Sequence, residues 1–129
     1  MENNDNCCIA KILKVIDILQ RESTCDLLSE GCDKPFLGNG EATAYNTRPI
    51  QLYTRAGNLF NVNYYVNNNL TTSNVFRVED VNGCCAKLRI LKKDCTKEIT
   101  TYDSTNEFVT VNLECFCIVR CLADTYVEI

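Results

Sequence analysis

Cysteine is the residue type in this chain that offers the most chemistry. The chain contains ten cysteines among 129 residues and has no histidine. The Ser–His, Cys–His and histidine–metal sites on which many enzymes depend are therefore absent. The acidic residues are scattered without a paired-carboxylate motif, and Gly38-Asn39-Gly40 lacks the other residues of a phosphate-binding loop. We accordingly expect no enzyme, no catalytic residue and no cofactor.

Cysteine thiolates alone can hold a structural zinc ion, usually through two pairs of cysteines spaced two to four residues apart. Cys115-Phe116-Cys117 and Cys117-x3-Cys121 come near this spacing, and Cys84-Cys85 could add ligands. The match is weak, because the side chains of adjacent cysteines point apart and rarely bind one tetrahedral ion. We therefore expect no metal ligand, while a small soluble module that coordinates metal through cysteines stays open as the alternative function.

Three cysteines near the C-terminus fit a strand core better than a metal site. Residues 107–122 predict a long strand in which alternate positions are apolar. Cys115, Cys117 and Cys121 share the apolar parity with valine and leucine, and free cysteine is among the most buried residue types. We expect these three to be internal. A strand of this length usually bends or contains a bulge.

The two adjacent cysteine pairs predict reactive thiols. Cys7-Cys8 begins the expected helix and Cys84-Cys85 follows a hairpin turn, and exposure and chain mobility concentrate at such places. Cys85 shares a strand face with Lys87 and Arg89, and a thiol beside cationic side chains reacts more readily. The expected sites of bonds between molecules are Cys7, Cys8, Cys84 and Cys85. The sequence leaves three cysteines unassigned: Cys25, Cys32 and Cys95.

One helix and a series of strands must position these cysteines. A 3.6-residue apolar period in residues 7–22 predicts an amphipathic helix, whose packed side chains are Ile9, Ile12, Leu13 and Ile16. Residues 75–92 predict a hairpin with the loop Val81-Asn82-Gly83. In this loop Gly83 takes the left-handed position, and Val78 lies opposite Ala86.

The order of these elements predicts the fold class. Loop-forming residues follow the helix, and strand patterns then continue from Ile50 to the C-terminus. We expect a mainly β fold, a single antiparallel β-sandwich or barrel-like domain with one N-terminal α-helix. Residues 1–22 would supply the N-terminal segment and helix and residues 23–129 the β-rich body, together forming one domain.

Composition excludes several classes of protein. Apolar residues make up 46% of the chain and charged residues 23%, which is typical of a folded domain. A net charge of −4 argues against sequence-independent nucleic-acid binding. The longest apolar runs fall short of the roughly 18 residues that span a bilayer, and the polar residues 1–6 do not resemble a signal peptide. The many cysteines conflict with the lack of a signal peptide, because disulfides persist mainly in oxidising compartments.

A set of motifs occurs in order along the chain: Lys34-Pro35-Phe36-Leu37-Gly38, Asn46-Thr47-Arg48-Pro49, Leu52-Tyr53-Thr54-Arg55-Ala56-Gly57, Phe76-Arg77-Val78-Glu79, Cys85-Ala86 with Leu88-Arg89, Val111-Asn112-Leu113-Glu114-Cys115-Phe116-Cys117, and Cys121-Leu122. Together they cover most of residues 8–122. In this order they resemble the CotY/CotZ spore-coat family, which includes the exosporium protein ExsY. The chain departs from the family in a short N-terminus and a short connection between Lys92 and Tyr102.

The resemblance implies a structural protein of the outermost layers of the bacterial spore, the coat crust or the exosporium basal layer. Members of the family self-assemble into hexagonal two-dimensional arrays that cysteine cross-links reinforce. The implied partners are further copies of the chain, in hexamers that tile, and other spore-coat proteins, with no nucleic acid and no membrane span. Synthesis in the mother-cell cytoplasm without a signal peptide, followed by oxidation after lysis, would resolve the cysteine conflict.

Overall fold

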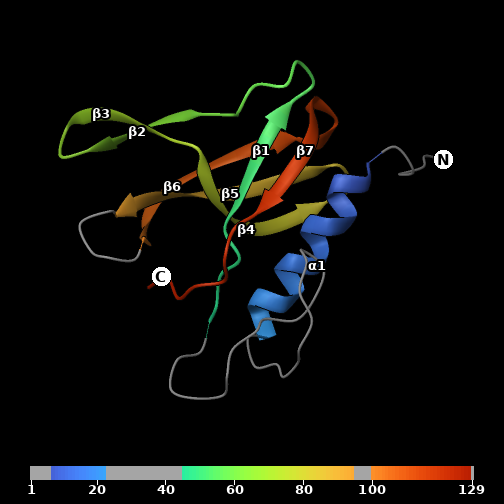
Figure 1. Cartoon of the computed structure of the whole chain (residues 1–129), viewed down its shortest axis with the longest axis horizontal. Helices are drawn as coiled ribbons and strands as arrows, with labels where there is room; N and C mark the ends of the chain where they lie inside the picture. The colour runs from blue at the N-terminus through green and yellow to red at the C-terminus, as the bar shows by residue number, and fades with distance from the viewer. Residues whose placement is uncertain (1–6, 23–44, 95–99, 129) are drawn as a thin grey trace.

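The computed structural model describes residues 7–22, 45–94 and 100–128. Within these ranges the chain forms one helix, then seven strands with a short 3-10 helix before the last of them (Figure 1). The elements are α1 (Cys8–Glu22), β1 (Ile50–Thr54), β2 (Val62–Val66), β3 (Asn69–Ser73), β4 (Val75–Asn82), β5 (Cys85–Asp94), β6 (Thr101–Asn112), η2 (Leu113–Cys115) and β7 (Phe116–Cys121).

Five strands form one antiparallel sheet in the order β6-β5-β4-β1-β7. β2 and β3 pair only with each other and form a separate ribbon that extends from the sheet (Figure 1). The prediction of a mainly antiparallel β fold with one N-terminal helix is confirmed. The described strands close no barrel, because β6 and β7 stand at opposite ends of the strand order.

Helix α1 packs its apolar stripe against the sheet, chiefly against β4. Leu13 and Ile16 are fully buried against Phe76 and other core residues, as the helical period predicts. Ile9 is also buried, and Ile12 is half-buried at the edge of the core. Burial of such side chains stabilises the fold by about 1.5–3 kcal/mol each, which offsets the modest helix propensity of isoleucine and valine.

A buried glutamine fixes the C-terminal end of α1. Gln20 Nε2 donates a hydrogen bond of 2.8 Å to the carbonyl oxygen of Val78 on β4. The Arg48 amide, which precedes β1, donates to Gln20 Oε1 at 3.0 Å. The helix is thus hydrogen-bonded to two segments distant in sequence, and its orientation on the sheet does not rest on apolar contacts alone.

Strands β4 and β5 form the expected hairpin, but in a different register. Asn82 lies opposite Cys85, so the turn consists of Gly83 and Cys84 rather than three residues. A bulge between Val78 and Asp80 then places Val78 opposite Leu88, not Ala86. The two-residue turn alone would place apolar side chains opposite polar ones. The bulge shifts the pairing by one residue, so apolar side chains of the two strands still lie opposite each other. Gly83 has φ +63°, the left-handed conformation that the sequence assigns to it.

Charged side chains pair on the sheet face that α1 does not cover. Arg77 on β4 lies opposite Arg89 on β5, and Glu79 Oε2 accepts from Arg77 Nη1 at 2.8 Å and from Arg89 Nε at 2.9 Å. The Arg89 guanidinium also lies 4.5 Å from the ring centroid of Phe108 on β6. One carboxylate therefore bridges two arginines that would otherwise repel each other.

A second charged pair joins the start of β1 to the segment after β7. Arg48 Nε and Nη2 donate to the two carboxylate oxygens of Asp124 at 2.7 and 3.0 Å, and the side chains are only 4% and 9% exposed. Thr47, the residue before Arg48, connects this pair to the group around Glu79, since Arg77 Nε donates to the Thr47 hydroxyl at 2.8 Å. We call the five charged residues the arginine network: Arg48, Arg77, Glu79, Arg89 and Asp124.

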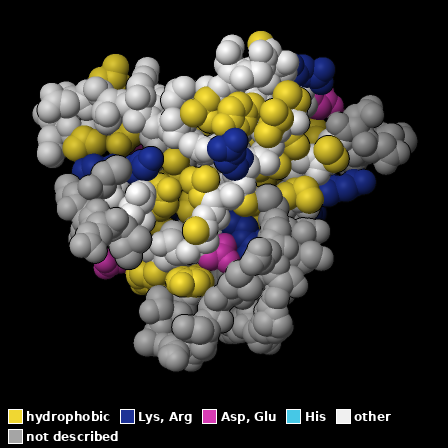
Figure 2. Space-filling model, viewed as in Figure 1, with side chains coloured by type: hydrophobic (Ala, Val, Ile, Leu, Met, Phe, Trp, Pro, Cys, Tyr) yellow, Lys and Arg dark blue, Asp and Glu magenta, His cyan; other side chains and the backbone are white. Residues whose placement is uncertain are grey.

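The exposed surface also carries apolar side chains. In the view of Figure 2, yellow apolar groups gather over β1 and β7, with basic groups among them. Ile118 on β7 and Phe108 on β6 are 48% and 42% exposed, and Tyr65 and Leu70 lie opposite each other on the ribbon at 64% and 56%. These residues leave apolar area available for contact with other molecules.

Candidate cross-linking site

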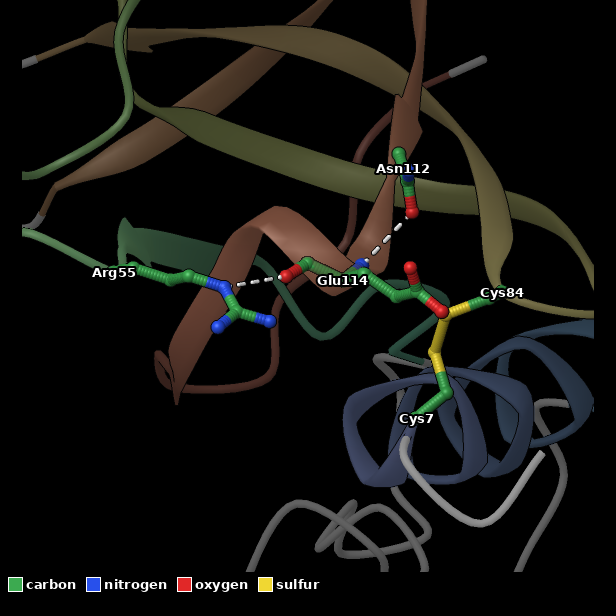
Figure 3. Close-up of a disulfide and its surroundings, with 5 residues drawn as sticks. All are labelled: Cys7, Arg55, Cys84, Asn112 and Glu114. Atoms are coloured by element: carbon green, nitrogen blue, oxygen red, sulfur yellow. Dashed lines mark hydrogen bonds between the residues drawn. A yellow bond between two sulfur atoms is a disulfide. The ribbon is translucent and has the colours of Figure 1, made fainter.

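A disulfide joins the start of the helix to the turn of the hairpin. Cys7, immediately before α1, is bonded to Cys84 across 77 residues of sequence, with a Cα–Cα distance of 5.9 Å (Figure 3). That distance lies within the usual range for disulfides. Because the bond closes a long loop of chain, it stabilises the fold mainly by restricting the unfolded state.

The 3-10 helix η2 packs beside this disulfide (Figure 3). The Leu113 amide donates to the Cys84 carbonyl oxygen at 2.8 Å. Asn112 Oδ1 accepts from the Glu114 amide at 3.0 Å, and Arg55 Nε donates to the Glu114 carbonyl oxygen at 2.9 Å. Hydrogen bonds thus hold the hairpin turn, η2 and the turn after β1 together around the sulfur atoms.

Among the described residues, four cysteines have exposed free thiols, and they lie on α1, β5, η2 and β7. Cys8 follows Cys7 on the helix, and Cys85 follows Cys84 on β5 opposite Asn112. Cys117 on β7 lines a small cavity of about 100 Å³ together with Cys7 and Cys8. We call the whole group the cysteine corner: Cys7, Cys8, Cys84, Cys85, Cys115 and Cys117.

The structure corrects the expected role of two cross-link candidates. Cys7 and Cys84 are bonded within the chain rather than held free for another molecule. The reason is the packing of α1 on β4, which brings the start of the helix to the hairpin turn. No local pattern in the sequence signals a contact over this separation. The other two candidates, Cys8 and Cys85, are exposed and unbonded.

The structure also corrects the core assignment of Cys115 and Cys117, which are both exposed. The expected interruption of the long strand is present as η2. Odd-numbered residues face the core directly before it, whereas the even-numbered Phe116 faces the core directly after it. Leu113 is buried before the turn and Phe116 after it, so Cys117 moves to the surface, where its Sγ lies 3.2 Å from the Thr54 carbonyl oxygen. Asn112 carried a usable signal, because asparagine often bonds the amide two residues on and ends a regular strand.

The remaining cysteines fall into two groups. Cys121 is half-buried, packs against the core and is disulfide-bonded, in keeping with an internal residue. The three cysteines left unassigned by the sequence lie outside the described residues: Cys25, Cys32 and Cys95.

The described residues contain no group of three or more cysteine, histidine or acidic side chains placed to hold a metal ion. The near-motif formed by Cys84-Cys85, Cys115, Cys117 and Cys121 is not brought together as a ligand set. Nor is any helix in the described ranges long and apolar enough to cross a membrane.

Comparison with known proteins places the chain in a family. The family model "Spore coat protein Z" matches residues 1–102. Spore coat protein Z of Bacillus subtilis (strain 168) is 27% identical over 141 aligned residues, which cover 95% of this chain and 93% of that protein. No solved structure matches the chain significantly. The match confirms the resemblance to the CotY/CotZ proteins, and since it spans well over half of the sequence, the chain belongs to the spore coat protein Z family.

Proposed function

We propose that this protein is a subunit that self-assembles into a two-dimensional lattice in the outer layer of the spore, and that disulfides between subunits reinforce the lattice. Membership of a spore-coat family supports a structural role in that layer and argues against an enzyme. The observation that carries the finer proposal is the cysteine corner, in which four thiols are exposed and form no disulfide. The lattice would form the coat crust or the exosporium basal layer.

Two different edges of the sheet are available for contacts between copies. β6 and β7 end the strand order, so each presents one side without a strand partner among the described residues. Contacts between unlike surfaces of identical copies close into rings or continue into open arrays. Rings of six that tile a plane are the arrangement we propose, with the exposed Phe108 and Ile118 adding apolar area beside the edges.

Covalent bonds would then fasten contacts that are individually weak. A disulfide needs Cα atoms within about 7 Å, so only cysteines that the lattice brings together can bond. Thiols on the surface meet this condition without disturbing the core. Synthesis in the reducing cytoplasm of the mother cell, with bonding after assembly, explains why a protein so rich in cysteine keeps several thiols free. Other coat proteins with exposed thiols could join the same lattice.

Electron microscopy of the purified protein, before and after reduction, tests this proposal. We expect ordered sheets with six-fold symmetry that persist without reductant and come apart more easily with it. A monodisperse monomer at micromolar concentration in native buffer contradicts self-assembly. Metal analysis of the same sample tests the alternative, because a cysteine-coordinated module would retain stoichiometric zinc after dialysis and remain small.

A further inference from the structure

We propose that the Cys7–Cys84 disulfide is itself reactive: an exposed thiol of a second copy attacks the Cys84 sulfur and displaces Cys7. The two chains are then joined through Cys84, and Cys7 is left as a free thiol. This inference rests on the proposed function, because it specifies how bonds between subunits form. It assigns different roles to the two cysteines of the disulfide, one that is attacked and one that leaves.

Access favours attack at Cys84. Thiol–disulfide exchange depends on which sulfur the attacking thiolate can reach. Cys7 is only 4% exposed, whereas Cys84 is half-buried in the two-residue turn between β4 and β5. Beside it, the space that a side chain at Gly83 would occupy is empty to 4 Å. An incoming thiol therefore has readier access to Cys84 than to Cys7.

The position of Cys7 makes it a good leaving group. It immediately precedes α1, and the N-terminal end of a helix favours a negative charge. No acidic residue lies in that first turn, and of the two charged residues that line the small cavity beside Cys7, Arg55 favours the anion and Glu114 opposes it. Thiolates at helix N-termini are stabilised, and exchange is faster when the departing thiolate is more stable.

Only an attack from a second copy joins two chains. Cys85 of the same chain cannot attack Cys84, because consecutive Cα atoms are about 3.8 Å apart, closer than disulfides usually allow. Attack by Cys8, Cys115 or Cys117 of the same chain would only move the bond within the molecule. Exposed thiols of another molecule have no such restriction. The exposed thiols in the cysteine corner of one molecule can therefore react with the Cys7–Cys84 disulfide of another molecule.

The step needs no oxidant. One thiolate of the second copy forms a bond to Cys84 as the Cys7–Cys84 bond breaks, and the Cys7 thiolate takes up the proton that the attacking thiol has lost. The number of free thiols stays constant during the reaction. Oxidation of two surface thiols would instead remove two free thiols for every cross-link and would require an electron acceptor.

A mixing experiment separates the attacked copy from the attacking copy. The attacked copy is isotopically labelled protein whose free thiols are blocked with N-ethylmaleimide while its disulfides remain intact. The attacking copy is the Cys7→Ser/Cys84→Ser variant, freshly reduced and freed of reductant. The two are mixed without oxygen and with a metal chelator, quenched with iodoacetamide, and mapped by mass spectrometry.

We expect a mixed cross-link from Cys84 of the labelled chain to a cysteine of the other, with one iodoacetamide-labelled Cys7 for each cross-link. A control uses labelled, blocked Cys7→Ser/Cys84→Ser protein as the attacked copy, and this mixture should give no such bond. Attachment through Cys7, or cross-links that appear only after an oxidant is added with a loss of two thiols each, overturns the inference.

Electron microscopy of the same mixtures reports on the lattice separately. Arrays without cross-linking in the absence of oxidant would reject the exchange step and leave the proposed function standing. Cross-linked pairs without arrays would support the exchange and contradict the lattice. Circular dichroism of the double variant tests whether the attacking copy is folded, and labelled wild-type protein with its surface thiols unblocked provides a second attacked copy that carries no chemical modification.

Discussion

The arginine network and the cysteine corner belong to the same fold, but they differ in whether their side chains have bonding partners within the chain. In the network, each charged group is hydrogen-bonded within the chain, and no buried side-chain nitrogen or oxygen atom in the described ranges lacks a partner. In the corner, four thiols are exposed and unbonded. The network therefore stabilises the subunit, whereas the corner retains thiols that form no bond within the described chain, as the proposed cross-linking requires.

The motif residues of the family divide between these two regions. Asn46-Thr47-Arg48-Pro49, Phe76-Arg77-Val78-Glu79 and Leu88-Arg89 supply most of the network. Cys85 and the segment Val111–Cys117 supply much of the corner. A shared motif can therefore mark either a structural contact or an exposed reactive group, and only the burial of its side chains distinguishes the two.

The largest effect on stability should come from the network. Asp124→Ala leaves the buried Arg48 guanidinium without its carboxylate. Removing one partner of a buried pair costs about 3–5 kcal/mol, because the remaining charge is desolvated and uncompensated. Urea unfolding of thiol-blocked protein, followed by circular dichroism, measures the change. Glu128→Ala is the control, since this exposed carboxylate near the same end of the chain should change stability by less than about 0.5 kcal/mol. Equal losses would contradict the assignment.

The disulfide should have the next largest effect. Cys7→Ser/Cys84→Ser opens the loop that the bond closes, and we expect a loss of about 2–4 kcal/mol in the free energy of unfolding. The matched control is Cys8→Ser/Cys85→Ser, which changes the two adjacent exposed cysteines and keeps the bond. Urea unfolding without reductant compares the two. If the control loses as much stability, the bond does not tie the helix to the hairpin.

A smaller effect is expected where the arginine network meets the partly exposed Phe108. Phe108→Leu keeps an apolar side chain on β6 but removes the ring that lies 4.5 Å from the Arg89 guanidinium. A partly exposed cation–π contact contributes about 0.5–1 kcal/mol, so the loss should be of that order. Tyr65→Leu, at an exposed position of the ribbon, is the comparison and should cost less. Similar losses in both variants would show that the arginine contact contributes nothing beyond apolar area.

Sequence reasoning succeeded where a contact depends on local periodicity. The apolar stripe of residues 7–22 predicted that Leu13 and Ile16 are buried, and the left-handed conformation of Gly83 followed from turn chemistry. The family was also identified from the motifs. The first two of these inferences use residues a few positions apart, whose geometry is set by the helix or the turn.

The same reasoning failed where one inserted feature changes everything after it. The two-residue turn and the bulge at Glu79 together gave the hairpin a register different from the expected one, and η2 turned Cys115 and Cys117 from the expected core to the surface. A side-chain period of two is sensitive to every such insertion. The Cys7–Cys84 bond was missed for another reason, since its 77-residue separation is bridged only by tertiary packing.

The smallest effect on stability, and the largest on assembly, should follow replacement of the exposed thiols: Cys8→Ser, Cys85→Ser, Cys115→Ser and Cys117→Ser together. Each should cost less than about 0.5 kcal/mol, because water can hydrogen-bond an exposed hydroxyl. Buried hydroxyls, as the sequence predicted for Cys115 and Cys117, would cost about 1–3 kcal/mol each. Lattices should still form in electron micrographs, since the edges and apolar contacts remain. Heating in detergent without reductant should dissolve them while the parent resists; equal resistance would place the fastening at the other cysteines.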